Sequence, residues 1–84
     1  MKYSFFWTDR SRKDLEKIPS HRSKRIVDKI ESLSEDPHRT AERCEGYPYY
    51  YQRIGSHRVI FKIDDSALLI SVIKIGPRKK VYDR

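Results

Sequence analysis

The sequence contains few of the residues on which several common kinds of active site depend. It has one cysteine, Cys44, and three histidines among 84 residues. A single cysteine excludes an intrachain disulfide and fits a reducing compartment, and Cys44 lies in a charged stretch with no obvious activating partner. His21, His38 and His57 lack metal-ligand spacing to Cys44 or to a carboxylate. No glycine-rich phosphate loop, Ser-His-Asp arrangement or carboxylate pair stands out either, so we expect no metal ion and no small-molecule cofactor.

Long apolar runs are also missing. Apolar and charged residues each make up 37% of the chain, and no stretch approaches the length of a membrane span. Residues 1–7 are too few for the apolar region of a signal peptide and are followed by charge. We therefore expect a cytoplasmic protein with no membrane partner, built as one domain over residues 1–84. A domain of this size buries a modest core and is marginally stable alone.

Acidic residues are outnumbered, and the excess of positive charge is unevenly spread. The chain has 12 acidic and 19 basic residues, which gives a formal net charge of +7. Residues 9–42 hold nine basic and eight acidic residues, whereas residues 43–84 hold nine basic and four acidic residues. The positive field therefore belongs to the second half, as on a surface that binds an anion such as nucleic acid. The alternative is a small protein that is basic throughout.

Hydrophobic periodicity and breaker residues predict the order β-α-α-β-β-β. Helices are expected from Thr8 or Asp9 to about Lys17, and from a Ser20 cap to about Glu35, with Pro19 between them. A polar loop is expected over residues 38–46. The strands are expected at residues 3–7, 49–54, 57–64 and 68–75. This pattern predicts an α+β fold, a mostly antiparallel four-stranded sheet with a helical hairpin packed on one face.

The dipeptide Gly55-Ser56 fixes a hairpin register. Glycine at the first central position suits a type II′ turn, which places Arg53 opposite Arg58 and Tyr51 opposite Ile60. Directly opposed residues share a face of the sheet. One face then holds Tyr49, Tyr51, Arg53, Arg58, Ile60 and Lys62. The other face, which is expected to meet the helices, holds Tyr50, Ile54, Val59, Phe61 and Ile63.

The opposed pair Arg53 and Arg58 is the most informative feature of this register. Like charges directly across two strands cost roughly 0.2–1 kcal/mol, and a bound anion reverses the sign of that effect. Two planar guanidinium groups are well shaped to hold a phosphate, and a tyrosine on the same face can stack on a base. The alternative is that both arginines extend into water or pair with Asp64, Asp65 or Asp83.

Two segments carry a family resemblance. The first is Glu45-Gly46 followed by the strand residues Tyr50-Tyr51-Gln52-Arg53-Ile54-Gly55-Ser56-His57-Arg58-Val59-Ile60-Phe61. The second is Ile75-Gly76-Pro77-Arg78-Lys79-Lys80-Val81-Tyr82. With the helical hairpin broken at proline, these segments resemble the RelE/ParE superfamily of toxin–antitoxin toxins, most closely its RelE-like branch. The resemblance covers nearly the whole chain.

The resemblance implies an activity and a set of site residues. RelE-like relatives cleave mRNA on the ribosome without a metal, by attack of the ribose 2′-hydroxyl on the adjacent phosphate. By position, Arg58 is similar to the arginine that stabilises the pentacovalent phosphate, Arg78 to the basic group near the leaving 5′-oxygen, and Tyr82 to the tyrosine that orients the substrate. Arg53 matches the second of two basic residues on the preceding strand. The residues expected to contact RNA around them are Tyr49, Tyr51, Lys62, Lys79 and Lys80.

One departure from the family pattern concerns the general base. Tyr51 stands where the best-studied RelE-like enzymes have a basic residue, and an arginine stays protonated and accepts protons poorly. Relatives on this fold also include inhibitors of DNA gyrase, and fold alone does not decide between activities. We expect a toxin that acts on the ribosome and its mRNA and is inhibited by a cognate antitoxin. The alternatives are a non-enzymatic gyrase inhibitor and an inactive RNA-binding relative.

Overall fold

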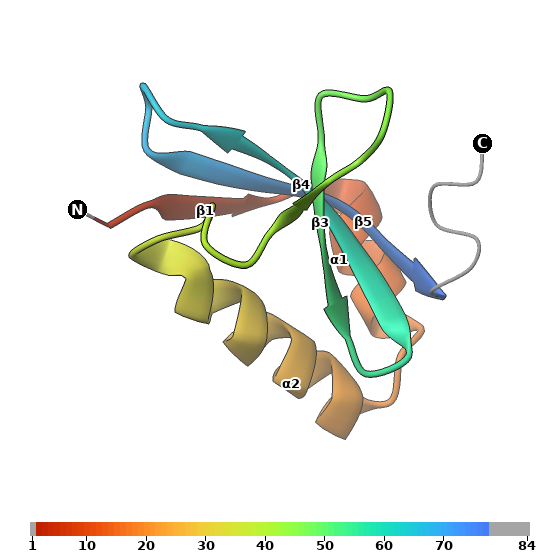
Figure 1. Cartoon of the computed structure of the whole chain (residues 1–84). Coiled ribbons are helices and arrows are strands. Elements are labelled where there is room, and N and C mark those ends of the chain that lie inside the picture. Colours follow the sequence, from red (N-terminus) through yellow and green to blue (C-terminus); the bar gives the residue numbers. More distant parts are fainter. Residues whose placement is uncertain (1, 78–84) are drawn as a thin grey trace.

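The computed structural model describes residues 2–77, which form an α+β fold. In chain order the elements are β1 (Ser4–Trp7), α1 (Asp9–Glu16), α2 (Ser20–Glu31), the 3₁₀ helix η1 (Ser32–Ser34), β2 (Glu42–Arg43), β3 (Tyr50–Ile54), β4 (His57–Asp64) and β5 (Leu69–Pro77). The strands form one sheet in the order β1-β5-β4-β3-β2 (Figure 1). β1 runs parallel to β5 and the other neighbours are antiparallel, which confirms the predicted fold class. Over these residues no helix is long and apolar enough to cross a membrane.

The sheet has one strand more than the sequence predicts. Within the predicted polar loop, Glu42 and Arg43 pair antiparallel with Tyr51 and Tyr50. A polar strand of two residues shows no apolar alternation, so hydrophobic periodicity cannot reveal it. This additional strand brings the Glu42 carboxylate beside β3.

The two helices begin and end close to the predicted positions, with one correction at each end of α2. Thr8 caps α1 as predicted, since its hydroxyl oxygen accepts a hydrogen bond from the Ser11 backbone N–H at 3.1 Å. Pro19, not Ser20, holds the cap position of α2, because its extended backbone turns its carbonyl toward the N–H groups of the first turn. The α-helix ends at Glu31, and η1 continues it as a tighter turn instead of the predicted run to Glu35.

The hairpin between β3 and β4 has the predicted register. Arg53 lies opposite Arg58, and Tyr51 lies opposite Ile60. Gly55 has a φ of +61° while Ser56 is not among the residues with positive φ, which is the sign pattern of a type II′ turn. The alternation of side chains along both strands therefore sorts arginines to one face and aliphatic residues to the other.

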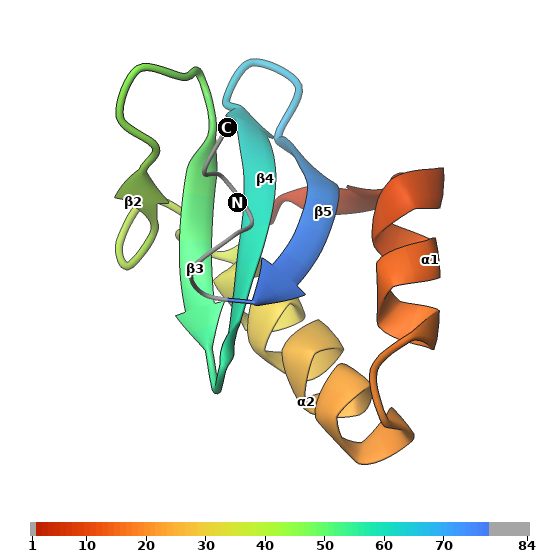
Figure 2. The same cartoon turned by 90° about the vertical axis from the view of Figure 1, so that its right-hand side faces the viewer.

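Both helices pack on the same face of the sheet, and within residues 2–77 no helix covers the opposite face (Figure 2). α1 lies alongside β5, and α2 lies next to the turn end of β3 and β4 (Figure 2). The main core lies between these helices and the sheet and contains Ile26, Ile30, Leu33, Ile54, Val59, Phe61, Ile70, Val72 and Ile75. A smaller buried cluster of Cys44, Tyr51 and Ile60 lies on the other face, which we call the open face.

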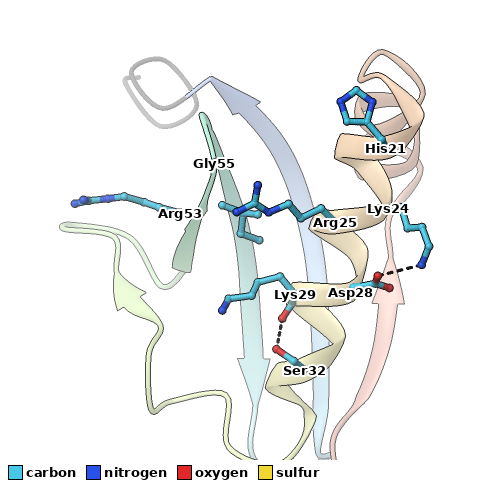
Figure 3. A pocket seen from close by; sticks show the side chains of 9 residues that line it. His21, Lys24, Arg25, Asp28, Lys29, Ser32, Arg53 and Gly55 are labelled. Carbon is cyan, nitrogen blue, oxygen red and sulfur yellow. Dashed lines mark hydrogen bonds and ion pairs between the residues drawn. The ribbon is translucent and has the colours of Figure 1, made fainter.

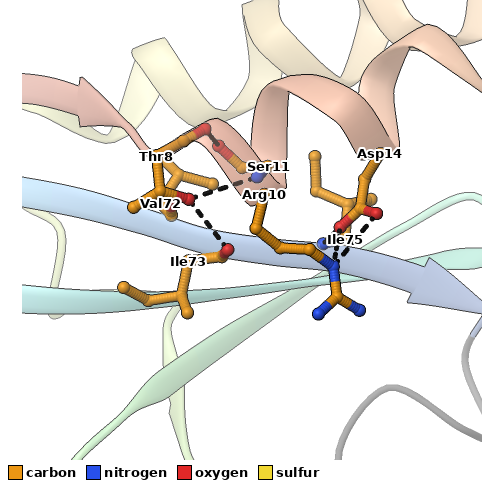
Figure 4. A network of polar contacts seen from close by, with 7 residues as sticks. All are labelled: Thr8, Arg10, Ser11, Asp14, Val72, Ile73 and Ile75. Atoms are coloured by element: carbon orange, nitrogen blue, oxygen red, sulfur yellow. Dashed lines mark hydrogen bonds and ion pairs between the residues drawn. The ribbon is translucent and has the colours of Figure 1, made fainter.

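Beyond the end of β1, the side chains of Thr8 and Asp14 form hydrogen bonds with backbone groups on the outer edge of β5. β1 pairs with β5 only as far as Val72. Beyond that point the Thr8 hydroxyl lies 2.9 Å from the carbonyl oxygens of Val72 and Ile73, and Asp14 Oδ2 accepts a hydrogen bond from the Ile75 N–H at 2.9 Å (Figure 4). The Asp14 side chain is only 11% exposed, so this bond fixes the end of β5 in a partly buried setting.

Candidate functional site

The register of four strands arranges the candidate residues in two rows on the open face. Directly opposed positions share a face, so one row runs across β3, β4 and β5 and the next row begins on β2. The first row is Arg53, Arg58 and Gly76. The second row is Glu42, Tyr51, Ile60 and Lys74. The sheet therefore brings together residues that lie more than thirty positions apart in the chain.

Arg58 is held against the aromatic ring of Tyr51. Its guanidinium carbon lies 4.5 Å from the centre of that ring, within the range of a cation–π contact. Tyr51 is itself only 8% exposed and packs with Ile60 and Cys44. Because the ring is fixed by packing, it provides a rigid support that limits the orientations of the guanidinium group.

Glu42 links Tyr51 to Arg53 and is the site residue that the sequence analysis missed. The Tyr51 hydroxyl donates a hydrogen bond to Glu42 Oε1 at 2.9 Å, and Arg53 Nη2 lies 3.9 Å from the same oxygen. The side chains of Arg53 and Glu42 are 48% and 52% exposed, so this ion pair contributes little to stability, roughly 0–1 kcal/mol. Its carboxylate remains accessible from the open face.

The acidic partners suggested for the arginines lie elsewhere. Asp64 accepts hydrogen bonds from the Ala67 N–H and from Ser66 within the β4–β5 turn, and these bonds hold the pKa of Asp64 below its usual range. Hydrogen bonds from the Tyr3 hydroxyl and from His38 likewise lower the pKa of Asp65. The third suggested partner, Asp83, lies outside the described residues. Within residues 2–77, Arg53 forms an ion pair with Glu42 instead.

Two of the predicted RNA contacts lie further along the open face. Lys62 Nζ is 5.5 Å from the ring centre of Tyr49, and Tyr49 packs against the small buried cluster. A ring with a lysine over its face presents a mixed aromatic and cationic surface. The remaining predicted site residues, Arg78, Lys79, Lys80 and Tyr82, lie outside the described residues.

Lys74 is a further cation of the open face that the sequence analysis did not single out. It lies opposite Ile60, and its positive charge, like that of Arg58, affects the pKa of the buried Cys44 thiol. Burial raises the pKa of the Cys44 thiol, and the positive charges of Arg58 and Lys74 partly oppose that rise. A buried thiol with a raised pKa is protonated at neutral pH, so Cys44 serves as a packing residue and not as a nucleophile.

A second basic surface lies on the other side of the hairpin, along α2. A groove of about 760 Å³ separates α2 from the β3–β4 turn and is lined by His21, Lys24, Arg25, Asp28, Lys29, Ser32, Arg53, Ile54 and Gly55. Arg25 reaches from α2 toward the hairpin, whereas the Arg53 side chain extends away toward the open face (Figure 3). Asp28 is paired with Lys24 at 3.1 Å. Three basic residues of the nearly neutral helical half, Lys24, Arg25 and Lys29, therefore line this groove.

Comparison with known proteins gives a consistent set of relatives. The family described as ParE toxin of type II toxin–antitoxin systems matches residues 5–82. The toxin RelG of Mycobacterium tuberculosis is 28% identical over 87 residues, which cover 100% of this chain and 100% of that protein.

Solved structures extend the likeness to the fold. The toxin–antitoxin complex RelBE2 of Mycobacterium tuberculosis contains a chain with a TM-score of 0.79 and 26% identity, covering 93% of this chain and 100% of that chain. A mutant of the E. coli toxin RelE in the free state gives a TM-score of 0.83 at 23% identity, covering 96% of this chain and 88% of that chain. The second likeness, at its lower identity, concerns the fold alone.

Proposed function

Since this chain belongs to the ParE toxin family of type II toxin–antitoxin systems, we propose that it is a toxin that cleaves mRNA on the ribosome. The observation that carries the proposal is the opposed pair Arg53 and Arg58 on the face of the sheet opposite helices α1 and α2. Arginines at directly opposed positions repel each other, and a phosphate bound by both removes that repulsion. A toxin that cleaves RNA needs such a phosphate-binding site, whereas a purely structural sheet does not.

The proposed reaction is a transfer within the RNA strand that needs no metal. The 2′-oxygen of a ribose attacks the adjacent phosphorus while the bond from phosphorus to the 5′-oxygen breaks, giving a 2′,3′-cyclic phosphate and a 5′-hydroxyl. Negative charge accumulates on the phosphoryl oxygens in the transition state. Arg58, steadied by the Tyr51 ring, stabilises that charge, and Arg53 holds the strand beside it.

Glu42 is the proposed acceptor of the 2′-hydroxyl proton. An arginine stays protonated, and the Tyr51 hydroxyl already donates its hydrogen to Glu42, so neither suits that role. The Glu42 carboxylate is half exposed on the same row as Tyr51 and has a second oxygen available to a substrate. In this scheme the proton passes to Glu42 and then to water, and the 5′-oxygen takes a proton from water.

A cognate antitoxin is the proposed protein partner. Relatives with solved structures include complexes of RelE-type toxins with antitoxins from Mycobacterium tuberculosis and E. coli. This chain carries a net charge of +7, and α1 and α2 both pack on the face of the sheet opposite Arg53 and Arg58. An acidic antitoxin segment that covers the open face would neutralise Arg53 and Arg58 and block the approach of RNA.

The test is to map mRNA ends on ribosomes after brief induction of the chain in cells. The parent should produce cuts within coding regions, and Arg58→Ala should reduce the rate by about 10²–10³-fold, as for loss of one group that stabilises an oxyanion. Arg12→Ala is the matched control, because that arginine is 66% exposed on α1 and far from the open face. Absence of cuts with the parent, or equal cutting by Arg58→Ala, would refute the proposal.

The match to the ParE family favours one second candidate, inhibition of DNA gyrase without cleavage of any nucleic acid. Purified chain added to gyrase would then block supercoiling at concentrations that leave translated mRNA intact. A chain that does neither, and that does not slow growth, fits an inactive RNA-binding relative.

A further inference from the structure

A third row of side chains crosses the open face, beyond the two rows of the candidate site. Lys62 lies opposite Ser71 on β5, and Ser71 lies opposite Phe6 on β1. On the other side of Lys62, its Nζ atom lies 5.5 Å from the ring centre of Tyr49. We call Phe6, Ser71, Lys62 and Tyr49 the third row, which has an aromatic ring at each end and a cation between them.

Phe6 is the unusual member of this row. Its neighbours Phe5 and Trp7 pack against the main core, so the alternation of side chains turns Phe6 to the open face. The exposed large hydrophobic residues within residues 2–77 are Phe6, at 56%, and Tyr47, at 48%. β1 is an edge strand, and natural proteins protect such edges with charged residues or proline because exposed apolar edges aggregate. Packing in the core therefore does not account for a phenylalanine at this position.

Aromatic rings and cations on one face of a sheet are suited to single-stranded nucleic acid. Bases stack on the rings, and the positive groups neutralise the phosphates. Three strand intervals separate Phe6 from Tyr49, because β5 and β4 lie between β1 and β3. At about 4.8 Å per interval the two backbone positions are roughly 14 Å apart. This spacing fits two bases of one strand with a further nucleotide passing Lys62 between them.

The third row lies on the same face as the opposed pair Arg53 and Arg58. Arg58 and Lys62 are four residues apart on β4, which separates them by about 13 Å. An RNA strand longer than one nucleotide can therefore reach both the arginine pair and the third row. Such a strand matches the rings through its bases and Lys62 through its phosphates, whereas an apolar protein segment matches the rings alone.

We propose that the third row is a stacking platform for bases of the mRNA that flank the cleaved nucleotide, with Phe6 as its outermost ring. The inference rests on the proposed mRNA cleavage and adds to it a second region of contact with the same strand. Phe6 is a positioning residue in this arrangement, because it lies away from the reacting phosphate. Its ring should therefore strengthen binding of the RNA and leave the rate of the chemical step unchanged.

The first experiment measures binding of an RNA that cannot be cleaved. A short fluorescent oligouridylate with 2′-O-methyl groups lacks the attacking hydroxyl, and its anisotropy reports binding to full-length chains at low salt. Phe6→Leu keeps an apolar side chain but loses the flat ring, so its Kd should rise at least about 5-fold. Phe6→Tyr keeps the ring and should bind as tightly as the parent.

Two controls separate stacking from other effects. Tyr47→Leu removes a ring of similar exposure from the loop before β3, outside the third row, and should bind like the parent. An oligomer of the same length without bases offers only phosphates, so the parent and Phe6→Leu should bind it equally. Thermal unfolding should give the same midpoint for all these chains, because the substituted side chains are largely exposed.

Cleavage on programmed ribosomes provides the second measurement. Phe6→Leu should need a higher concentration of toxin for half-maximal cleavage and should reach the parental rate at saturation. A parent that cuts no mRNA, but whose binding of the oligouridylate is weakened by Phe6→Leu, would overturn the proposed function and retain the stacking platform.

The inference itself is overturned by binding results. No binding by the parent, or equal binding of the oligouridylate by the parent and Phe6→Leu, would exclude the platform while leaving the proposed cleavage in place. An equal loss of affinity for the oligomer without bases would also exclude it, since that loss could not come from stacking.

Discussion

The two faces of this sheet use the same strands for opposite purposes. On the helix-covered face, Val59 and Phe61 of β4 are fully buried, and Ile54 of β3 is 6% exposed. On the open face the same strands present Arg53 and Arg58 above a buried cluster of only three residues. Because successive side chains alternate, one strand can stabilise the fold with every second residue and bind an anion with the others. Substitutions on one face should therefore change stability, and those on the other should change activity.

The largest effect is expected on the covered face. Phe61→Ala removes a fully buried ring from the main core and should lower the free energy of unfolding by about 3–5 kcal/mol. That loss is a large share of the stability of a small domain. Urea unfolding followed by circular dichroism measures it. The neighbour Lys62 points to the open face, and Lys62→Ala should change stability by less than about 0.5 kcal/mol. Equal losses of unfolding free energy in the two variants would contradict the expected difference between the two faces of the sheet.

The next effect concerns activity without stability. Glu42→Gln keeps an oxygen that can accept the hydrogen bond of the Tyr51 hydroxyl, so the fold should be unchanged. Loss of the proton acceptor should slow cleavage of mRNA on ribosomes by about 10²–10⁴-fold. Glu45→Gln is the control, since Glu45 is an exposed carboxylate three residues further on. A Glu42→Gln chain that cleaves at the parental rate would leave Glu42 a purely structural role.

A smaller effect is expected at the edge where α1 completes β5. Asp14→Ala leaves the Ile75 N–H without its acceptor in a partly buried setting and should cost about 1–3 kcal/mol of stability. Asp14→Asn retains an oxygen at the same place and should lose less. Thermal unfolding of the three chains tests this order. Should alanine and asparagine behave alike, the charge pair with Arg10 and not the hydrogen bond would be the important contact.

The smallest effect is a dependence of stability on acid pH that comes from Asp65 in the β4–β5 turn. The pKa of Asp65 is lowered by hydrogen bonds from Tyr3 and His38, so the folded state binds a proton there less readily than the unfolded state. The resulting stabilisation is complete above the unfolded pKa of about 3.9 and is lost as pH falls through the lower folded pKa. Melting temperatures of the parent and of Asp65→Asn should converge toward about pH 2. A constant difference down to that pH would contradict this assignment.

The residues around the turn were sufficient to predict the β3–β4 hairpin and the face of the sheet on which each of its side chains lies. Gly55-Ser56 fixes the turn, and strict alternation from Arg53 to Phe61 then fixes which side chains share a face. The Thr8 cap of α1 likewise depends on residues close together in sequence. These features follow from the sequence because their partners lie within a few positions of one another.

The features that sequence reasoning missed depend on distant pairing. Glu42 joins the site only because a polar strand of two residues pairs with β3. Lys74 reaches the open face through a ladder whose irregularity shifts the alternation of β5, so simple period-two counting misplaces it. The basic groove along α2 depends on which side of the helix faces the hairpin, and total charge does not report that.

The parallel pairing of β1 with β5 has a consequence for folding during synthesis. Ser4 pairs with Leu69 and Trp7 with Val72, so β1 cannot pair until β5 has been synthesised. Contacts that span most of a chain form slowly and cannot form before both partners have left the ribosome. A partly made chain therefore has an unfinished sheet and no assembled site, and ribosome-bound chains that stop before Leu69 should expose Phe5 and Trp7 to protease. The open face is thus assembled only after β5 has been synthesised.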